Sequence, residues 1–450
     1  MQRLIIKELK DWYKSKHRKP LIVQGARQVG KTYIIKEFAT KEFTQFIYIN
    51  WDTEKKLRKV FDEDFDVDRI IRDLSLILNV KINPKKDLIF FDEIQECPKA
   101  LHALKYFCED KPELAIIAAG SLLGVTLSEE SFPVGKVTFL NLYPMNFEEF
   151  LLAINEDDEE MAQIISKFNI NKTTKISNIV HQKIWELLLD YYIVGGLPEA
   201  VKMYVEEKNK KNHNGYLAAR NIHKTLIKSY GNDFAKHTGK LNASHIVEVF
   251  HNIPLQLAKN LDGSVQRYIF KNAIKGKNRF HDIIGPIDWL TRANLIIKTR
   301  ICNKSAIPLE SFCKDNIFKL YFFDIGLLAS ILDIPLDAIL KNDYGISKGF
   351  FAENFVAQEL KAINPEHSFY GWNEGDSEIE FLTYDHGKII PIEVKSGIRT
   401  RAKSLGVFMD RYKPPYAIKL SALNLHEDFC KNKTMVKNIP LYLASKVYSS

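Results

Sequence analysis

Short, continuous apolar runs alternate with helical patterns through the first third of the chain. The runs are PLIVQ at 20–24, FIYINW at 46–51, DLIFFDEIQ at 87–95 and LAIIAAGS at 114–121. Because they lack a regular polar alternation, they predict strands buried on both faces. Helical segments such as YIIKEFATKEF separate them. Strands and helices in this order predict an α/β fold with a parallel sheet covered by helices.

Helical periodicity dominates the middle of the chain. NFEEFLLAI, HQKIWELLLDYYI and LPEAVKMYVEE predict a helical lid, and the charged run EEKNKKNHNG at 206–215 predicts a solvated turn or linker. ASHIVEVFHNIPLQLA, SVQRYIFKNAI and DIIGPIDWLTRANLI predict three helices, which the apolar strands LIIKTRI and IFKLYFFD follow. Three helices and then a hairpin are the order of a winged helix-turn-helix.

The last part of the chain returns to a mixed pattern. A helix over ENFVAQELKAI precedes strands at 378–384 and 389–394, a helix near 402–412 and a strand over PYAIKLS. This order predicts a second, C-terminal α/β domain. The 450 residues therefore divide into an N-terminal α/β core, a helical lid, a winged-helix domain and a terminal α/β domain, expected at 1–150, 151–222, 223–340 and 341–450.

Charge and cysteine usage narrow the classes of partner and compartment. The net charge is +8, but residues 391–450 hold 11 Lys and Arg against 4 Asp and Glu, and residues 231–300 hold 11 against 5. Two late basic segments favour a polyanionic partner, with DNA first, although solvated lysine faces would give the same count. The five cysteines form no C-x-x-C pair, and neither a signal peptide nor a membrane-spanning stretch is evident. We expect a cytoplasmic protein without a membrane anchor.

The segment GARQVGKT at 25–32 matches the phosphate-binding pattern G-x-x-x-x-G-K-[ST] between a predicted strand and a predicted helix. Glycines 25 and 30 let backbone N–H groups turn towards phosphate oxygens, and the helix N-terminus adds positive charge. Lys31 is expected to reach the β- and γ-phosphates, and the Thr32 hydroxyl to bind Mg²⁺. The expected nucleotide-binding residues are Gly25, Ala26, Arg27, Gln28, Val29, Gly30, Lys31, Thr32 and Tyr33.

Two later strands are expected to complete this ATP site. DLIFFDEIQ delivers Asp92 and Glu93 to a strand end, where Asp92 would bind Mg²⁺ and Glu93 would polarise the attacking water. Ser121 ends the next strand and could sense the γ-phosphate. In the predicted lid, Pro198 follows two glycines; it would either lie against adenine or simply start a helix.

Several segments occur in the order seen in one group of proteins. They are GARQVGKT, FFDEIQ, AAGS, FPVGKV, LYPMNFEEF, GGLPEA, YFFDIGLL, ENFVAQEL and PIEVKSG. The chain resembles the bacterial and archaeal AAA-type ATPases that are fused to a C-terminal domain of unknown function. The resemblance implies an ATP-binding core, a winged helix and a restriction-endonuclease-like terminal fold. Several relatives have Arg where FPVGKV has Lys136, and Lys lacks the planar guanidinium of an arginine finger, so no finger is assigned.

The resembled nuclease-like fold places acids on a helix and a strand, followed by Glu-x-Lys on the next strand. Here the matching positions are Glu353, Glu380, Glu393 and Lys395. The three glutamates would bind Mg²⁺, while Lys395 would orient water or stabilise the developing negative charge. The central acid of that pattern is usually Asp, so Glu380 is a departure, and Glu393 with Lys395 could form only a salt bridge. Cleavage, binding without cleavage and a structural relic all remain open.

These features give three alternative functions. The first is an enzyme or switch that binds and hydrolyses ATP with Mg²⁺ and acts on or with nucleic acid. The second is a signalling switch that forms a homo-oligomer on binding ATP, recruits a protein partner and keeps an inactive nuclease-like fold. The third is an ATP-gated, metal-dependent DNA nuclease.

Overall fold

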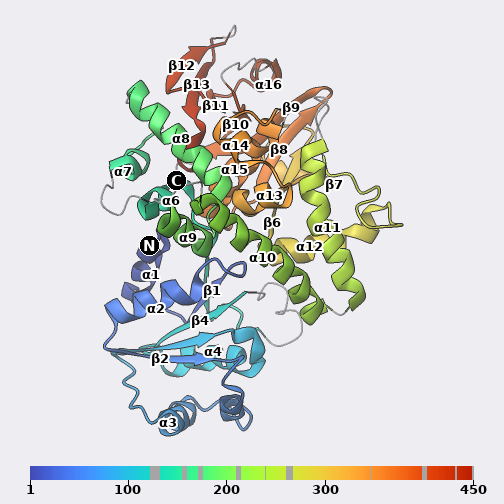
Figure 1. Ribbon diagram of the computed structural model, residues 1–450. Helices are drawn as coiled ribbons and strands as arrows, with labels where there is room; N and C mark the ends of the chain where they lie inside the picture. The colour runs from blue at the N-terminus through green and yellow to red at the C-terminus, as the bar shows by residue number, and fades with distance from the viewer. Residues whose placement is uncertain are drawn as a thin grey trace. The chain divides into compact units, whose positions relative to one another are not determined.

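The computed structural model describes residues 1–121, 132–154, 160–170, 176–208, 214–238, 240–259, 267–345, 347–397, 403–430 and 433–447 (Figure 1). The chain forms two compact units. The smaller contains residues 2–143 and 292–294, and the larger contains Met1, 144–291 and 295–450. Among the helices within the described ranges, none combines the length and apolar character needed to cross a bilayer.

The smaller unit is built on a parallel sheet, as the apolar runs predict. Its strands lie in the order β2-β3-β4-β1-β5, and every neighbouring pair is parallel. Because their carboxyl ends meet at one edge, loops that follow different strands converge there. Their bounds are β1 Leu21–Gln24, β2 Gln45–Asn50, β3 Asp87–Asp92, β4 Ala115–Gly120 and β5 Thr138–Asn141. The short β5 was not predicted.

Helices connect these strands (Figure 1, blue to cyan). Asp66 immediately precedes α3. Its carboxylate accepts a hydrogen bond from the Arg69 N–H and so caps the helix. Pro98 is the first residue of α4, where its missing N–H costs nothing. The helical elements are α1 Ile5–Lys14, α2 Lys31–Glu42, η1 Lys55–Phe61, α3 Val67–Leu78, η2 Ile94–Glu96 and α4 Pro98–Asp110.

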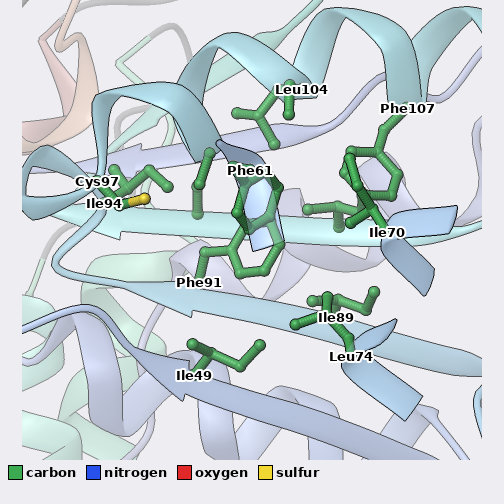
Figure 2. Packing of buried hydrophobic residues seen from close by; sticks show 14 of the residues in the cluster. Ile49, Phe61, Ile70, Leu74, Ile89, Phe91, Ile94, Cys97, Leu104 and Phe107 are labelled. Atoms are coloured by element: carbon green, nitrogen blue, oxygen red, sulfur yellow. The ribbon is translucent and has the colours of Figure 1, made fainter. Parts of the chain in front are cut away.

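A buried apolar cluster lies between the sheet and the segments that follow β2 and β3 (Figure 2). At its centre Phe91 lies 5.3 Å from the Trp51 ring and 6.2 Å from the Phe61 ring, centroid to centroid. All three side chains are almost completely buried, and each such burial stabilises the fold by about 1.5–3 kcal/mol. Phe91 directly precedes Asp92, so this packing fixes the strand end that carries the expected Mg²⁺ ligand.

The larger unit contains an eight-stranded mixed sheet in the order β12-β13-β11-β10-β9-β8-β6-β7. Three pairs are parallel, namely β6 with β8, β10 with β11, and β11 with β13, and the other pairs are antiparallel. The bounds are β6 Ile296–Cys302, β7 Cys313–Phe322, β8 Phe369–Glu374, β9 Ser377–Asp385, β10 Lys388–Val394, β11 Tyr416–Ser421, β12 His426–Phe429 and β13 Met435–Pro440.

Most of the predicted helical segments in this part of the chain are helices, whereas the helices at 160–166, 214–238, 325–331 and 336–340 were not predicted. The helices are α6 Phe147–Ile154, α7 Glu160–Ser166, α8 Asn178–Val194, α9 Pro198–Glu207, α10 Asn214–Thr238, α11 Lys240–Lys259, α12 Phe280–Arg292, α13 Ile325–Ile331, α14 Leu336–Leu340, α15 Ser347–Ile363 and α16 Lys403–Tyr412. Two short 3₁₀ turns, η3 Leu309–Phe312 and η4 Leu441–Lys446, complete them.

One predicted helix is wrong. From residue 267 onwards, where the structure describes it, the segment SVQRYIFKNAI forms irregular turns rather than a helix. Its apolar residues are explained by packing on β7: the Tyr268 and Phe270 rings contact Phe318, and the Tyr268 N–H donates to the Phe318 carbonyl at 2.8 Å. Tertiary contacts, rather than helical periodicity, therefore set the spacing of these side chains.

The hairpin expected as the wing is present, but it belongs to a larger sheet. β6 and β7 pair with each other, and β6 also pairs in parallel with β8 of the C-terminal segment. A parallel partner supplied from 70 residues downstream cannot be read from local patterning. The winged-helix domain and the boundaries at 150, 222 and 340 stay predictions.

Candidate functional site: a phosphate-binding loop and an acidic cluster

The phosphate-binding loop joins the end of β1 to the start of α2. Gly30, just before α2, has φ of +93°, a left-handed conformation that favours glycine. A Cβ atom at Gly25 would lie 2.1 Å from the Leu142 carbonyl oxygen, so a side chain there cannot be accommodated. The two glycines are thus required for different reasons, one for backbone conformation and the other for close approach.

Lys31 is buried at the start of α2, with 8% of its surface exposed. Its ammonium donates hydrogen bonds to the carbonyls of Gly25 at 2.9 Å and Ala26 at 2.8 Å. Burial lowers the pKa of Lys31 to about 8, and the charges of Glu93 and Asp92 oppose this only in part. A buried ammonium held by neutral carbonyls is suited to an added anion such as a phosphate.

Asp92, the last residue of β3, lies next to Thr32, which follows Lys31 in α2. The Thr32 hydroxyl donates to Asp92 Oδ2 at 2.8 Å, and the Glu93 N–H donates to Oδ1 at 3.1 Å. A hydroxyl beside a carboxylate is an oxygen ligand pair of the kind that Mg²⁺ prefers. The residues present therefore fit a nucleotide-bound Mg²⁺ held by Thr32 and Asp92.

Glu93 and Ser121 complete this edge of the sheet. Glu93 has φ of +50°, unusual for a residue with a side chain, and its Oε2 accepts a hydrogen bond from Gln95 Nε2 at 2.5 Å. Ser121 directly follows β4 and is 4% exposed, and its hydroxyl has no hydrogen-bond partner among the described residues. A buried unpaired hydroxyl is costly in the free protein and suited to binding a ligand oxygen.

Other residues expected to bind nucleotide lie in the same loop. Ala26 and Val29 are buried, whereas the Tyr33 side chain is 60% exposed on α2. Gln28 has φ of +67° and Arg27 is partly exposed. Their contributions to nucleotide binding stay predictions.

Three further residues support the site and were missed in the sequence. Tyr48 donates its hydroxyl proton to Asp92 Oδ2 at 3.1 Å, and Asn50 Nδ2 donates to the Tyr48 oxygen at 3.3 Å. The Arg3 guanidinium donates to the Val29 carbonyl at 3.0 Å and so stabilises the conformation of the phosphate-binding loop. The signal for Tyr48 and Asn50 was available: they end the strand beside β3, where Asn50 lies opposite Asp92. No local pattern points to Arg3.

Pro198 is the first residue of α9 in the larger unit, so the helix-start interpretation describes its position. The glycines before it make room for partners. A Cβ on Gly195 would lie 2.3 Å from Asp324 Oδ1, and one on Gly196 would lie 2.0 Å from the Met145 carbonyl oxygen. Contact between Pro198 and adenine stays a prediction.

Asp324 links the glycine pair before α9 to the start of α13. Its carboxylate accepts hydrogen bonds from the N–H groups of Gly196 at 2.7 Å and Leu327 at 2.8 Å. Burial raises the pKa of Asp324 to about 6. Nearby, Glu359 accepts from the Phe147 N–H at 2.8 Å and Gln358 accepts from the Ile325 N–H at 2.8 Å. The motifs MNFEEF, GGLPEA, FFDIGLL and ENFVAQEL thus meet in one buried polar network.

The four residues of the nuclease-like pattern also come together, at the centre of the eight-stranded sheet. Lys395 forms an ion pair with Glu393, and its Nζ lies 3.8 Å from Glu380 Oε1. The Val394 N–H donates to Glu380 Oε2 at 3.0 Å, which fixes that carboxylate beside β10. Glu353 reaches the same region from α15. We call Glu353, Glu378, Glu380, Glu393, Lys319 and Lys395 the acidic cluster.

Lys319 of β7 and Glu378 of β9 are members of the cluster that the sequence did not reveal. The Lys319 ammonium lies 3.2 Å from Glu353 Oε2 and forms a second ion pair with Glu378. The Tyr321 hydroxyl also donates to Glu353 Oε2, at 3.1 Å. Only the pairing of β7 into the C-terminal sheet brings these residues in, so no motif could have predicted them.

Charge and burial shift the titration of this cluster strongly. Burial, followed by the negative charge of Glu393, raises the pKa of Glu380 well above its usual value, and burial also raises the pKa of Glu393. Burial alone would lower the pKa of Lys319, but Glu353 and the neighbouring acids outweigh it and raise that pKa well above its usual value. The lysines are thus firmly charged.

The acidic cluster does not fit a metal ion in this arrangement. In the described part of the chain, no three Asp, Glu, His or Cys side chains are placed so that they could hold one metal. The ammonium groups of Lys319 and Lys395 lie among the carboxylates instead. One buried atom, Glu393 Oε2, has no hydrogen-bond partner among the described residues. The expected metal roles of Glu353, Glu380 and Glu393 and the catalytic role of Lys395 stay predictions.

Lys136, for which the resemblance implied Arg in relatives, forms an ion pair within the smaller unit. Its Nζ lies 2.8 Å from Glu109 Oε1, and both side chains are more than a third exposed. Exposed ion pairs of this kind contribute little to stability.

Three family matches cover most of the chain. Residues 17–151 match the family described as AAA domain, residues 186–338 match a domain of unknown function (DUF8612), and residues 348–442 match a second one (DUF4143). The first match, the parallel sheet and the loop geometry agree with an AAA-type P-loop fold for residues 17–151. The C-terminal match carries no assigned activity.

Among curated proteins, none matches this chain. Solved structures with similar arrangements include the Walker-type ATPase PABY2304 of Pyrococcus abyssi, at 16% identity and a TM-score of 0.45, covering 73% of this chain and 94% of that one. The Aeropyrum pernix Orc1 protein in complex with DNA is similar at 12% identity and a TM-score of 0.29, covering 75% and 92%. Thermotoga maritima RuvB is similar at 14% identity and a TM-score of 0.29, covering 66% and 90%. With TM-scores this low, none of these likenesses supports a functional assignment.

Proposed function

We propose that the smaller unit binds ATP with Mg²⁺ and hydrolyses it. The backbone of the loop from Gly25 to Tyr33 would surround the phosphates, and the Lys31 ammonium would move from the loop carbonyls to the β- and γ-phosphates. Mg²⁺ held by Thr32 and Asp92 would neutralise charge that develops on the phosphates. Glu93 would accept a proton from the attacking water, and Ser121 would donate a hydrogen bond to the γ-phosphate.

The observation that carries this proposal is the buried Lys31 ammonium, which is held by carbonyls beside a hydroxyl–carboxylate pair. The test is ATP turnover by wild type, Lys31→Ala and Glu93→Gln. We expect Glu93→Gln to bind ATP normally but to turn it over at least about 100-fold more slowly, since general-base removal costs about that much. Equal turnover in all three proteins would contradict hydrolysis at this site.

We also propose that the protein acts on or with nucleic acid through its larger unit. The supporting feature is the excess of basic residues in 231–300 and 391–450. Titration of duplex and single-stranded DNA at two salt concentrations tests this, because phosphate contacts make binding salt-dependent. Absence of binding at low salt would remove nucleic acid as a partner.

A second candidate is a switch that forms a homo-oligomer on binding ATP and keeps a terminal domain that does not cut. The ion pairs of the acidic cluster favour a terminal domain that is inactive in cleavage. Molecular mass in solution with and without ATP separates the candidates: assembly driven by ATP without DNA binding would favour the switch. A nuclease gated by ATP would instead nick plasmid DNA with Mg²⁺ or Mn²⁺, and lose this activity in Glu393→Ala.

The cytoplasmic location remains part of the proposal. Its support is that all five cysteines carry free thiols, as expected in a reducing compartment.

A further inference from the structure

Two cysteines lie side by side at the loop end of the β6–β7 hairpin. Cys302, the last residue of β6, is the cross-strand partner of Cys313, the first residue of β7. Their sulfur atoms are 2.8 Å apart, although the residues are 11 positions apart in the sequence. Both sulfurs lie 3.4 Å from the Leu309 carbonyl oxygen. The fold therefore holds two thiols in contact at a place that neither the ATP site nor the acidic cluster includes.

The backbone pairing suits a covalent bond between these two sulfurs. The Asn303 N–H donates to the Phe312 carbonyl at 3.0 Å, so Cys302 and Cys313 form the neighbouring non-hydrogen-bonded pair of the ladder. The Cα atoms of such pairs are about 4.5 Å apart, and disulfides form at Cα separations of roughly 4.4–6.8 Å. A disulfide here therefore requires no change of strand register.

The two thiols differ in exposure and in acidity. Cys302 is completely buried, whereas Cys313 is partly exposed. The hydrogen bond from the Cys302 thiol lowers the pKa of Cys313, and the positive charge of Arg300 acts in the same direction, against the effect of burial. The pKa of Cys302 is raised, first by its contact with Cys313 and then by burial. Because the thiolate is the nucleophile, Cys313 is placed to attack an oxidant and Cys302 to resolve the product.

The other three cysteines have different surroundings. Cys97 and Cys108 belong to the smaller unit, and burial raises the pKa of both thiols, that of Cys97 to about 11. Cys430 packs against the same apolar cluster as the cross-strand pair. It is therefore the competing thiol that an experiment on the pair has to exclude.

A bond between Cys302 and Cys313 would close the segment 303–312 into a covalent loop. This segment contributes Ser305, Ala306 and Ile307 to one wall of a cavity of about 410 Å³, and residues 387–389 and 412–415 supply the other walls. A covalent bond between the ends of a loop restricts the conformations that the loop can adopt. The bond would therefore restrain this wall of the cavity.

We propose that Cys302 and Cys313 form a reversible disulfide when the surrounding thiol–disulfide ratio becomes oxidising, and that this bond restrains the loop 303–312. The oxidant is a small disulfide such as glutathione disulfide. The Cys313 thiolate attacks one of its sulfurs and releases one glutathione thiolate, which leaves a mixed disulfide on the protein. Cys302 loses its proton, attacks Cys313 Sγ and releases the second glutathione thiolate. The two protein thiols thus pass two electrons and two protons to the oxidant, which becomes two thiols.

The test uses the full chain in buffers with increasing ratios of glutathione disulfide to glutathione, without nucleotide. Free thiols are then alkylated, and the chain is digested and mapped by mass spectrometry. We expect peptides joined through Cys302 and Cys313, while Cys97, Cys108 and Cys430 are alkylated. Dithiothreitol should restore all five thiols. Hydrogen exchange in the segment 303–312 should slow at least about threefold in the oxidised protein.

Cys302→Ala separates the two steps of the reaction. Without a resolving thiol, the reaction should stop at a mixed disulfide of Cys313 with glutathione. Cys313→Ala should leave the buried Cys302 unmodified. Cys108→Ala is the matched control, because it removes a partly buried cysteine of the smaller unit, and it should form the disulfide as wild type does.

The mapping of wild type decides the proposal even if a variant fails to fold. Alkylation of all five cysteines at the most oxidising ratio would overturn it. A disulfide from either member of the pair to Cys430, or glutathione that stays on Cys313 in wild type, would overturn it as well. A disulfide between Cys302 and Cys313 that leaves hydrogen exchange in 303–312 unchanged would overturn the effect on the loop. None of these outcomes bears on ATP hydrolysis or on nucleic acid, so the proposed function is tested separately.

Discussion

Two buried lysines, Lys31 in the smaller unit and Lys319 in the larger, have opposite electrostatic surroundings. Lys31 donates to two loop carbonyls, and burial lowers its pKa to about 8. Lys319 contacts two carboxylates, and its pKa is raised well above the usual value. An ammonium that makes no ion pair is prepared for an anionic ligand, whereas one that already contacts carboxylates is part of a buried ion pair. The same residue type at similar burial therefore indicates a binding site in one unit and a structural ion pair in the other.

Replacing Lys31 gives the largest expected effect on function. In Lys31→Met the positive charge aimed at the phosphates is lost, and we expect ATP turnover to fall about 1000-fold, the scale on which a transition-state charge donor contributes. Because the free protein also loses the cost of burying that charge, its thermal midpoint should stay the same or rise. Steady-state ATPase assays and a thermal melt without nucleotide measure the two effects. A strong loss of stability in Lys31→Met would contradict the comparison.

Replacing Lys319 should reverse this pattern. In Lys319→Met the carboxylates of Glu353 and Glu378 lose their buried partner, and we expect a loss of about 3–5 kcal/mol from the larger unit. ATP turnover should change little. Hydrogen exchange of peptides from β7 and β9 localises the loss, and Lys341→Met, an exposed lysine, is the control.

The loss in Lys319→Met should depend on pH. Burial raises the pKa of Glu380 and Glu393 above their usual values, so the protonated forms are favoured in the folded state. Folding then takes up protons, and stability from this source falls as pH rises past the usual carboxyl range. The Lys319 charge opposes the rise in the pKa of Glu380, so its loss costs most where Glu380 is ionised. We therefore expect Lys319→Met to be less destabilised at pH 5 than at pH 8. An equal loss at both values would contradict the assigned electrostatics.

ATP binding should weaken at alkaline pH, with a smaller effect. The pKa of Lys31 is about 8 in the free protein, so at pH 9 only about a tenth of the molecules would keep the ammonium ready for phosphate. We expect the dissociation constant for ATP to rise about tenfold between pH 7 and pH 9. Binding of a fluorescent nucleotide checks this, and Lys31→Met should bind weakly with no such pH dependence.

The smallest predicted effect concerns Tyr48. Its hydroxyl donates to the Asp92 oxygen that Thr32 also contacts, so it helps to orient the expected Mg²⁺ ligand. We expect Tyr48→Phe to raise the Mg²⁺ concentration needed for half-maximal turnover about threefold to tenfold, with little change in turnover at saturating Mg²⁺. Tyr48→Leu is a matched comparison that also removes the ring under Lys36, whose Nζ lies 3.5 Å from the ring centroid. A change confined to the maximal rate would argue against a positioning role.

Local sequence predicted the positions of the phosphate-binding loop and of Asp92, because these parts are contiguous in sequence or end buried strands. Gly30, Lys31 and Thr32 occupy one turn, and Asp92 ends a strand whose apolar run leaves little choice of conformation. Tyr48 could have been found by the same reasoning about strand ends. Arg3 could not, since it reaches the loop from the irregular residues that precede α1.

Local sequence failed to predict secondary structure where apolar side chains of an irregular segment pack on a distant strand. SVQRYIFKNAI has the composition of a helix, yet Tyr268 and Phe270 pack on β7 from turns. The sequence offered two interpretations of Pro198 and none for the two glycines before it. Only the tertiary structure explains these glycines, through the close approach of Asp324 and Met145.

The sequence by itself determined the parallel ATPase sheet, the phosphate-binding loop and the grouping of Glu380, Glu393 and Lys395, because periodicity, turn residues and strand alternation are local properties. The tertiary structure alone decided that β6 and β7 join the C-terminal sheet, and with them that Lys319 enters the acidic cluster. The physical reason is that strand pairing joins distant segments, and a buried charge depends on every group that pairing brings within a few ångströms.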